Sequence, residues 1–338
     1  MFVEITIREM LEQREHVELC EYAAFSDKTS GRRVNEELCD VRTEYQRDRD
    51  RILHCKSFRR LKQKTQVFLA PEGDHYRTRL THTLEVAQIA RTIAKGLFLN
   101  EDLAEAIALG HDLGHTPFGH AGERALNEVC PFGFAHHEQS VRVITILEKN
   151  GDGLNLTNEV IDGVRNHQTA GAPFTLEGKI VRLSDKIAYT NHDIADAVRA
   201  GIIEKGDIPK EYVNILGATR SQRLNTLIHD VIRCSFARNE IEMSEHVYQA
   251  LYGLRTFLFE RVYTNPVAKG QERKAVDLVK QLYEYYLKHI QKLPSEYIDF
   301  IEKRGDEKEK VVCDYVAGMT DNYAIRKYKD CFIPNVWK

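Results

Sequence analysis

The chain has 338 residues, of which 42% are apolar and 29% charged, values ordinary for a globular protein with a substantial core. Its 48 basic and 51 acidic side chains give a formal charge of −3, so net charge gives no reason to expect a dedicated nucleic-acid-binding or membrane protein. No apolar run approaches the roughly 20 residues that span a bilayer, and the N-terminal residues lack the apolar core of a signal peptide.

The seven cysteines are odd in number and form no C-x-x-C pair. This scatter is typical of reduced thiols and unlike a disulfide framework or a zinc knot. We therefore expect free cysteines and a cytoplasmic location.

Apolar residues recur mostly at spacings of three and four, and the chain has only eight prolines. The helices that this pattern predicts cover residues 81–96, 101–114, 120–129, 138–149, 158–167, 177–200, 210–233, 243–263, 271–292 and 307–317. Strand-type alternation is weak, although residues 66–69 could form a short hairpin arm. We predict a single all-α domain over residues 1–338, with a metal-bearing helical core at about 45–205 and a C-terminal helical lobe at about 206–338.

The strongest chemical signal is the run HDLGH at residues 111–115, followed by a further imidazole at position 120. His82 lies on the apolar face of the helix predicted upstream, and Asp185 lies in the middle of the long apolar helix predicted downstream. A carboxylate on such a face is costly to bury unless a cation satisfies it. We predict that His82, His111, Asp112 and Asp185 bind one divalent metal ion.

Imidazole and carboxylate ligands together favour Mn, Mg, Fe, Co or Ni, without choosing among them. Four such ligands leave two positions of an octahedral ion for water and a phosphate oxygen, which is the arrangement of a metal-dependent phosphohydrolase. A single His-Asp pair is usually a surface or capping contact. The combination of four ligands on three predicted helices favours the metal site.

The ordered pattern H…HD…D resembles that of the HD-domain metal phosphohydrolases. Longer stretches narrow the resemblance to the deoxynucleoside triphosphate triphosphohydrolases, the dGTPase-like family: RTRLTHTLEVAQIARTIA (77–94), EAIALGHDLGHTPFGHAGERALNE (105–128) and IVRLSDKIAYTNHDIADAVRAGI (180–202). The resemblance extends over nearly the whole chain. It implies an HD-domain helical bundle with an additional C-terminal helical lobe. It also implies hydrolysis of a dNTP to deoxynucleoside and tripolyphosphate, through attack of water on the α-phosphorus.

His120 and Glu123 are three residues apart at a predicted helix start, so an imidazole and a carboxylate can form an acid–base pair. The resemblance places both in catalytic positions and His115 over the phosphates. It also matches His137 and Glu138 to a second catalytic element found in part of the family. Helix-start capping or exposure is the alternative for His137 and for its neighbour at position 136.

The resemblance also implies the residues that bind the substrate. Arg79 and Lys186 are expected to contact phosphates, Tyr189 to stack under the sugar, and Asp193 to bind its 3′-hydroxyl. Gln66 is expected to approach the sugar. A tyrosine in that position would leave little room for a 2′-hydroxyl and so favour deoxyribose. The alternatives are solvated helix charges for the cations and a place in the core for the tyrosine.

Further partners follow less directly. Arg220 and Arg223 could add phosphate contacts, and the broad apolar faces in residues 243–292 favour a homo-oligomer, which in the family is a dimer, tetramer or hexamer. A nucleotide effector stays open, because no residue identifies its site. Single-stranded nucleic acid is a minor alternative, because few aromatic residues accompany the basic residues of 47–64. No membrane partner is expected.

The sequence leaves two other functions open. One is a different HD-type nucleotide phosphohydrolase, such as a 5′-nucleotidase, an alarmone hydrolase or a cyclic-nucleotide phosphodiesterase. The cyclic dinucleotide branch is disfavoured, because it carries lysine where this chain has His115. The other function is a non-catalytic nucleotide sensor. The presence of all four metal ligands favours the enzyme.

Overall fold

A computed structural model describes residues 5–66, 77–264 and 266–334. These residues form sixteen α-helices and no named strand, with two isolated bridges that join Arg32 to Thr157 and Thr65 to Thr78. The predicted all-α fold is confirmed. Most of the hairpin arm expected at residues 66–69 lies outside the described residues. No described helix has both the length and the apolar character needed to cross a bilayer.

The chain divides into two compact units, each assembled from three separate stretches. The first unit comprises Met1–His54, His82–His111 and Leu154–Asn265, and the second comprises Cys55–Thr81, Asp112–Gly153 and Pro266–Lys338. This division by contacts does not test the expected core and lobe at residue 205, which stay a prediction.

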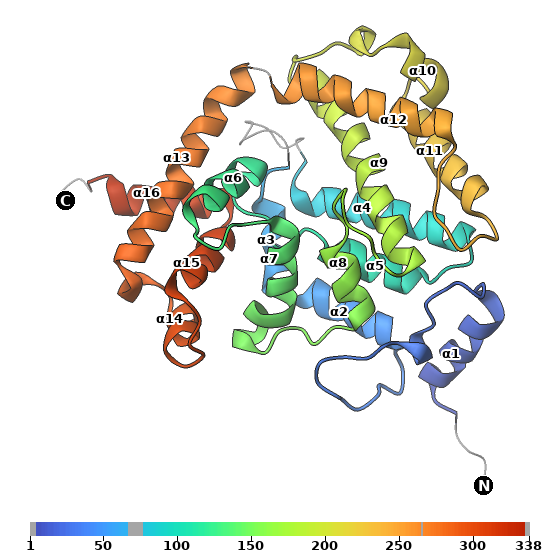
Figure 1. The fold of residues 1–338 in the computed structure, drawn as a ribbon, viewed down its shortest axis with the longest axis horizontal. Helices are drawn as coiled ribbons and strands as arrows, with labels where there is room; N and C mark the ends of the chain where they lie inside the picture. The colour runs from blue at the N-terminus through green and yellow to red at the C-terminus, as the bar shows by residue number, and fades with distance from the viewer. Residues whose placement is uncertain (1–4, 67–76, 265, 335–338) are drawn as a thin grey trace. The chain divides into compact units, whose positions relative to one another are not determined.

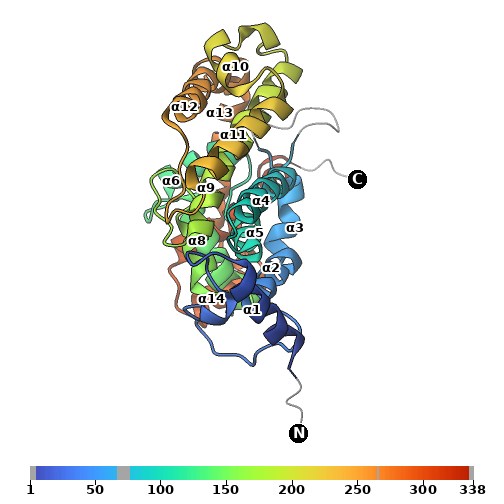
Figure 2. The same ribbon diagram turned by 90° about the vertical axis from the view of Figure 1, so that its right-hand side faces the viewer.

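The long helix α9 is the centre of the first unit. It packs against α5, α8, α11 and α12, and both ribbon views show it passing beside α11 and α12 (Figures 1 and 2). The α-helices of this unit are α1 (Ile7–Glu18), α2 (Glu44–His54), most of α4 (Arg79–Gly96), α5 (Glu101–Gly110), α8 (Asn158–Arg165), α9 (Leu176–Arg199), α10 (Lys210–Leu216), α11 (Arg220–Ser235) and α12 (Glu245–Leu258).

The second unit is organised around α13, which packs against α6, α15 and α16. Its core is rich in aromatic rings, because α13, α14 and α15 each direct tyrosine or phenylalanine side chains inward. The α-helices of this unit are α3 (Lys56–Arg60), α6 (Gly119–Val129), α7 (His136–Arg142), α13 (Pro266–Lys288), α14 (Ser295–Glu302), α15 (Lys308–Ala317) and α16 (Asp321–Phe332).

Several predicted helices are interrupted in ways that the apolar spacing did not reveal. The helix expected at 101–114 ends at Gly110, so the HDLGH run forms a turn after its first histidine. The helix expected at 210–233 breaks at Gly217, whose φ of 110° is open to glycine and strained for other residues. The helix expected at 138–149 changes after Arg142 into a π-helical turn and then a 3-10 segment.

Candidate metal centre and acid–base cluster

Three predicted metal ligands meet in the first unit. His82 lies near the start of α4, His111 is the C-cap of α5, and Asp185 lies on α9. The Nε2 atom of His82 is 3.0 Å from Oδ1 of Asp185, and the Nε2 atom of His111 is 3.9 Å from the same oxygen. Both histidine residues are 1% exposed. The packing of α5 against α9 therefore brings together residues that are far apart in sequence.

The orientation of the His111 ring fits a metal ligand. Its Nδ1 lies 2.6 Å from the carbonyl oxygen of Ala108, so the ring proton sits on Nδ1 and donates to that carbonyl. The Nε2 lone pair is then directed toward the Asp185 carboxylate, which is also an acceptor. A cation between two facing acceptors satisfies both, so this donor set fits a divalent ion.

Asp112 follows His111 in the chain and is the first residue of its stretch in the second unit. Its carboxylate accepts from Nη1 of Arg79 at 2.7 Å, and Nε2 of His115 lies 3.2 Å from its other oxygen. Arg79 is 2% exposed, so this ion pair is shielded from water. The phosphate contact expected of Arg79 stays a prediction, and the structure shows that its guanidinium neutralises a predicted metal ligand.

A continuous series of ring and carboxylate contacts leads from Asp112 to the surface of the second unit. The ring of His115 stacks on that of His136 with centroids 4.1 Å apart, and Nδ1 of His136 is 2.9 Å from Oε1 of Glu123. The other oxygen of Glu123 is 3.1 Å from Nδ1 of His120, whose side chain is 69% exposed. The predicted pair of His120 and Glu123 is therefore a hydrogen-bonded unit with one solvent-facing imidazole.

The titration of this cluster follows from its burial. Burial alone would raise the pKa of Glu123, but hydrogen bonds from His120 and His136 outweigh it and hold that pKa well below its usual range. Burial, with the neighbouring Arg79 charge, lowers the pKa of His115 well below its usual value. Glu123 is thus ionised and His115 neutral at physiological pH.

Sequence reasoning assigned His136 only a capping or exposed position, whereas the structure brings its ring into the cluster. Asp112, His115 and His136 each offer one ligand atom, and these atoms lie within 4.8 Å of one another. His137 is partly buried with its ring centroid 5.6 Å from that of His136, and Glu138 is exposed. Their predicted catalytic role remains a prediction. Only the adjacency of the two histidines in sequence could have pointed to His136.

In the first unit, the residues predicted to bind the phosphates and the sugar lie beside Tyr252 and Arg255, which the sequence analysis did not identify. Lys186 lies over the ring of Tyr252 at 5.9 Å, and Arg255 lies over the rings of Tyr189 and Tyr252 at 5.9 Å each. Burial lowers the pKa of Lys186 and raises that of Tyr189. The packing of α9 on α12 therefore gathers two cations and two aromatic rings, which can bind an anionic, ring-bearing ligand.

Asp193 has a partner that local sequence could not reveal. The hydroxyl of Tyr263 donates to its Oδ2, and its Oδ1 is buried without a hydrogen-bond partner among the described residues. Burial raises the pKa of Asp193 to about 7. The predicted role of Asp193 in binding a sugar hydroxyl stays a prediction, and the unpaired oxygen is an acceptor that such a hydroxyl would satisfy.

The remaining candidates lie in different surroundings. Gln66 belongs to the second unit, and its buried Oε1 has no hydrogen-bond partner within the described part of the chain. Arg220 donates to Glu85 at 2.6 Å, and Arg223 donates to Asn191 at 2.9 Å. Both arginines therefore tie α11 to neighbouring helices of the first unit, so their expected phosphate contacts stay predictions.

Comparisons with known proteins agree on one family. The HD domain model matches residues 79–190, and the phosphohydrolase-associated domain model matches residues 241–330. A deoxyguanosinetriphosphate triphosphohydrolase-like protein of Caldanaerobacter subterraneus is 56% identical, over 98% of this chain and 97% of its own. One of the same name from Clostridium tetani is 46% identical, over 98% of each chain.

Among solved structures, a phosphohydrolase of Bacteroides thetaiotaomicron matches with a TM-score of 0.51 and 17% identity. The match covers 81% of this chain and 66% of that protein. At this identity the likeness shows the fold alone.

Proposed function

The chain belongs to the family of deoxyguanosinetriphosphate triphosphohydrolase-like HD-domain proteins, and from this membership we propose that it hydrolyses a dNTP to a deoxynucleoside and inorganic tripolyphosphate. The family establishes an HD-type nucleotide phosphohydrolase dependent on a metal. The observation that supports the finer proposal is the series of contacts from Asp112 through His115, His136 and Glu123 to His120. It provides proton-carrying groups next to a metal ligand.

The proposed metal ligands are His82, His111, Asp112 and Asp185. When bound, a divalent ion polarises a phosphate oxygen and lowers the pKa of water. The buried Arg79–Asp112 pair keeps the Asp112 carboxylate in one orientation. The carbonyl of Ala108 does the same for the His111 ring.

The leaving group of the proposed reaction is the 5′ oxygen of the deoxynucleoside, which needs a proton as the phosphorus–oxygen bond breaks. We assign this proton to the His120–Glu123 pair, because the exposed imidazole of His120 is hydrogen-bonded to the ionised Glu123 carboxylate. Neutral His115 lies between Asp112 and His136 and can donate a hydrogen bond to a phosphate oxygen. His137 and Glu138 are proposed to assist.

The remaining residues are proposed to hold the substrate. Lys186 and Arg79 would contact the phosphates of a tetra-anionic nucleotide, with Arg255 as a further cation. Tyr189 would lie under the sugar and Asp193 would accept from its 3′-hydroxyl. Gln66 would approach the sugar.

Product analysis tests this proposal. The purified protein, with Mn or Mg, would be offered each dNTP and each NTP, and the products separated by anion exchange. The names of these relatives make dGTP the first nucleotide to examine. Tripolyphosphate and deoxynucleoside are expected from the wild type and from Asp330→Ala, an exposed carboxylate on α16, and are expected to be absent from Asp112→Ala.

Other outcomes identify the alternatives. Monophosphate or diphosphate products would replace the proposal with another HD-type phosphohydrolase activity. Each nucleotide would also be added as a possible effector beside the substrate. Tight nucleotide binding without any product, even with these additions, would favour the non-catalytic sensor.

A further inference from the structure

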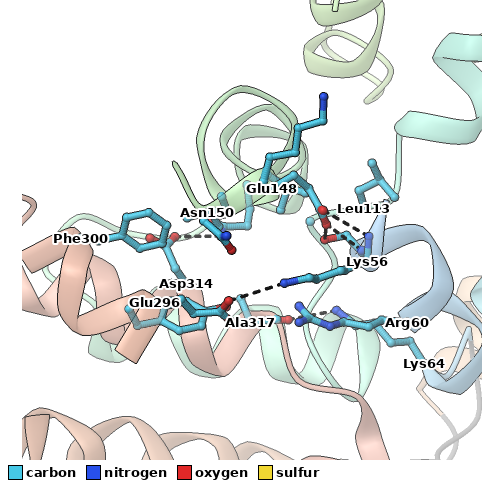
Figure 3. A pocket seen from close by; sticks show the side chains of 18 residues that line it. Lys56, Arg60, Lys64, Leu113, Glu148, Asn150, Glu296, Phe300, Asp314 and Ala317 are labelled. Atoms are coloured by element: carbon cyan, nitrogen blue, oxygen red, sulfur yellow. Dashed lines mark hydrogen bonds and ion pairs between the residues drawn. The ribbon is translucent and has the colours of Figure 1, made fainter. Parts of the chain in front are cut away.

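The second unit contains a cavity that none of the acid–base residues lines. Its walls come from α3, α7, α14, α15 and the residues that follow Asp112 (Figure 3). The cavity has a volume of about 30 Å³, which exceeds the space that one water needs. It opens to solvent, so a small polar group can enter it.

Gln139 lines this cavity and carries an acceptor without a hydrogen-bond partner among the described residues. The side chain is 3% exposed, and its Nε2 donates to Oδ1 of Asp314 at 2.9 Å. This bond fixes the orientation of the amide, because only the nitrogen can donate to a carboxylate. Its Oε1 is buried and has no hydrogen-bond partner in the described parts of the chain. Burying an acceptor unpaired costs about 1–3 kcal/mol, so the site favours an occupant with a donor.

The carboxylates that line the cavity are already engaged. Asp314 accepts from Arg142 at 2.8 Å, and Glu148 accepts from the backbone and hydroxyl of Ser57 at 2.7 and 2.6 Å. Glu296 lies 3.6 Å from Nζ of Lys56, and Figure 3 shows this ion pair at the cavity. The negative charge of the walls is therefore largely compensated from within the protein.

Arg60, by contrast, is a cation without an opposite charge among the described residues. Its guanidinium meets the hydroxyl of Tyr297 and lies beside Gly318, and it forms no ion pair there. Lys64, wholly buried next to it, uses its ammonium on the carbonyls of His115 and Ala317. The positive charge of Arg60 can thus be neutralised by an incoming anion, whereas Lys149, which also lines the cavity, is exposed to solvent.

We propose that this cavity binds a small phosphate-bearing ligand that also presents a hydroxyl, with Arg60 contacting the oxyanion and Oε1 of Gln139 accepting from the hydroxyl. Hydrogenphosphate is the simplest probe of this class, because it carries both the negative charge and a P–OH donor. Sulfate has nearly the same shape and charge but no proton to donate at neutral pH. A lone acceptor in the cavity therefore distinguishes the two anions.

An occupant would contact the elements that carry the acid–base cluster. Leu113 and Gly114, which line the cavity, follow Asp112 directly, and Gln139 is three residues after His136 on α7. Gly114 is packed so closely against Ser140 that a Cβ there would lie 2.1 Å from its backbone nitrogen. An effect of the ligand on turnover rests on the proposed function, whereas its binding does not.

Calorimetric titration of the metal-free, nucleotide-free full chain with inorganic phosphate tests the proposal. We expect the wild type to bind phosphate, and Arg60→Gln to bind it at least about tenfold more weakly through loss of a charge-assisted contact. Arg59→Gln is the matched control, because Arg59 is exposed on the same helix and does not line the cavity. It is expected to bind within about twofold of the wild type, since surface charges contribute little. Sulfate is expected to bind at least about tenfold more weakly than phosphate.

Thermal unfolding of each variant shows whether it is folded. If Arg60→Gln does not fold, the exposed rim variant Lys56→Gln replaces it, with an expected weakening of about threefold. Absence of phosphate binding to the wild type would overturn the proposal, as would equal affinity for phosphate and sulfate. If Arg60→Gln, or Lys56→Gln in its place, is folded and binds phosphate as tightly as the wild type, the phosphate binds elsewhere and the proposal is overturned. None of these results depends on whether the protein hydrolyses a dNTP.

Discussion

At the scale of single residues, Glu123 has the most demanding position, because it accepts from two histidines through different oxygens. We expect Glu123→Gln to lower kcat by about 10²–10³-fold, since a neutral amide does not replace the charged carboxylate of the proposed acid–base pair. KM should change by less than about threefold, because Glu123 contacts no predicted substrate residue. Steady-state kinetics with the dNTP that is turned over measures both constants.

Glu128→Gln is the control for this change, because Glu128 is an exposed carboxylate on the same helix, α6. It should retain full activity. A full retention of kcat by Glu123→Gln, or an equal loss in both variants, would remove Glu123 from the proposed acid–base pair.

The buried carboxylate of Asp193 leads to a prediction about how the free energy of unfolding depends on pH. Burial raises its pKa from the ordinary 3.8 to about 7, so below pH 7 the folded state holds a proton that the unfolded state releases above pH 4. Stability is therefore lost as the pH rises from about 4 to 7. Asp193→Asn abolishes this loss, and its amide oxygen can still accept from Tyr263.

We expect Asp193→Asn to be about 1–3 kcal/mol more stable than the wild type at pH 8 and nearly equal to it at pH 4. Urea unfolding at the two pH values, in the presence of a metal chelator, measures the difference. A variant that is less stable than the wild type at pH 8 would show that the ionised carboxylate is compensated and that burial does not dominate.

At the scale of the helix, the sequence located those elements whose apolar spacing is regular and whose ends carry a clear signal. The boundaries expected for α6, α9 and α15 differ from the observed ones by one residue at most. Helices α14 and α16 were missed, because they are short or lie near the end of the chain with few apolar positions. The turn to π-helix after Arg142 was missed as well, because its apolar run Val143–Leu147 also suits an α-helix.

In the candidate site, too, the sequence identifies residues within local patterns and misses those that packing brings in from distant segments. The HD run and the long helix through Asp185 are local patterns, so their chemistry is readable from the sequence. Tyr263 and Arg255 come to Asp193 and Tyr189 only through packing of distant segments. No sequence spacing connects them, and they could not be assigned without the structure.

The close approach of α5 and α8 gives a prediction at this scale. A Cβ at Gly163 of α8 would lie 2.5–2.8 Å from three side-chain carbons of Ile107, which is fully buried on α5. Alanine favours helix over glycine by about 1 kcal/mol, but the clash should dominate. We expect Gly163→Ala to destabilise the fold by about 1–3 kcal/mol.

Gly206→Ala is the matched control, because a Cβ there meets nothing within 4 Å. It should change the free energy of unfolding by less than about 0.5 kcal/mol, as surface substitutions usually do. Denaturant unfolding of both variants and of the wild type measures these changes in the free energy of unfolding. Equal stability of the two would mean that α5 and α8 can separate at little cost.

At the scale of the whole molecule, the chain passes repeatedly from one compact unit to the other. Each unit needs three separate stretches, and the border between two of them falls at His111 and Asp112. Both residues are proposed metal ligands. Binding of an ion to the native state alone would stabilise that state, by an amount set by its affinity and concentration.

At a metal concentration about 100-fold above Kd, this linkage amounts to about 2.7 kcal/mol. For a chain of 338 residues it corresponds to a rise in Tm of about 3–5 °C. Asp185→Asn removes a charged ligand and should lose this rise, whereas Asp330→Ala should retain it. Thermal unfolding with and without Mn, each against a chelator control, measures the shift. A full shift in Asp185→Asn would mean that the stabilising ion binds through other residues, and the proposed ligand set would have to be abandoned.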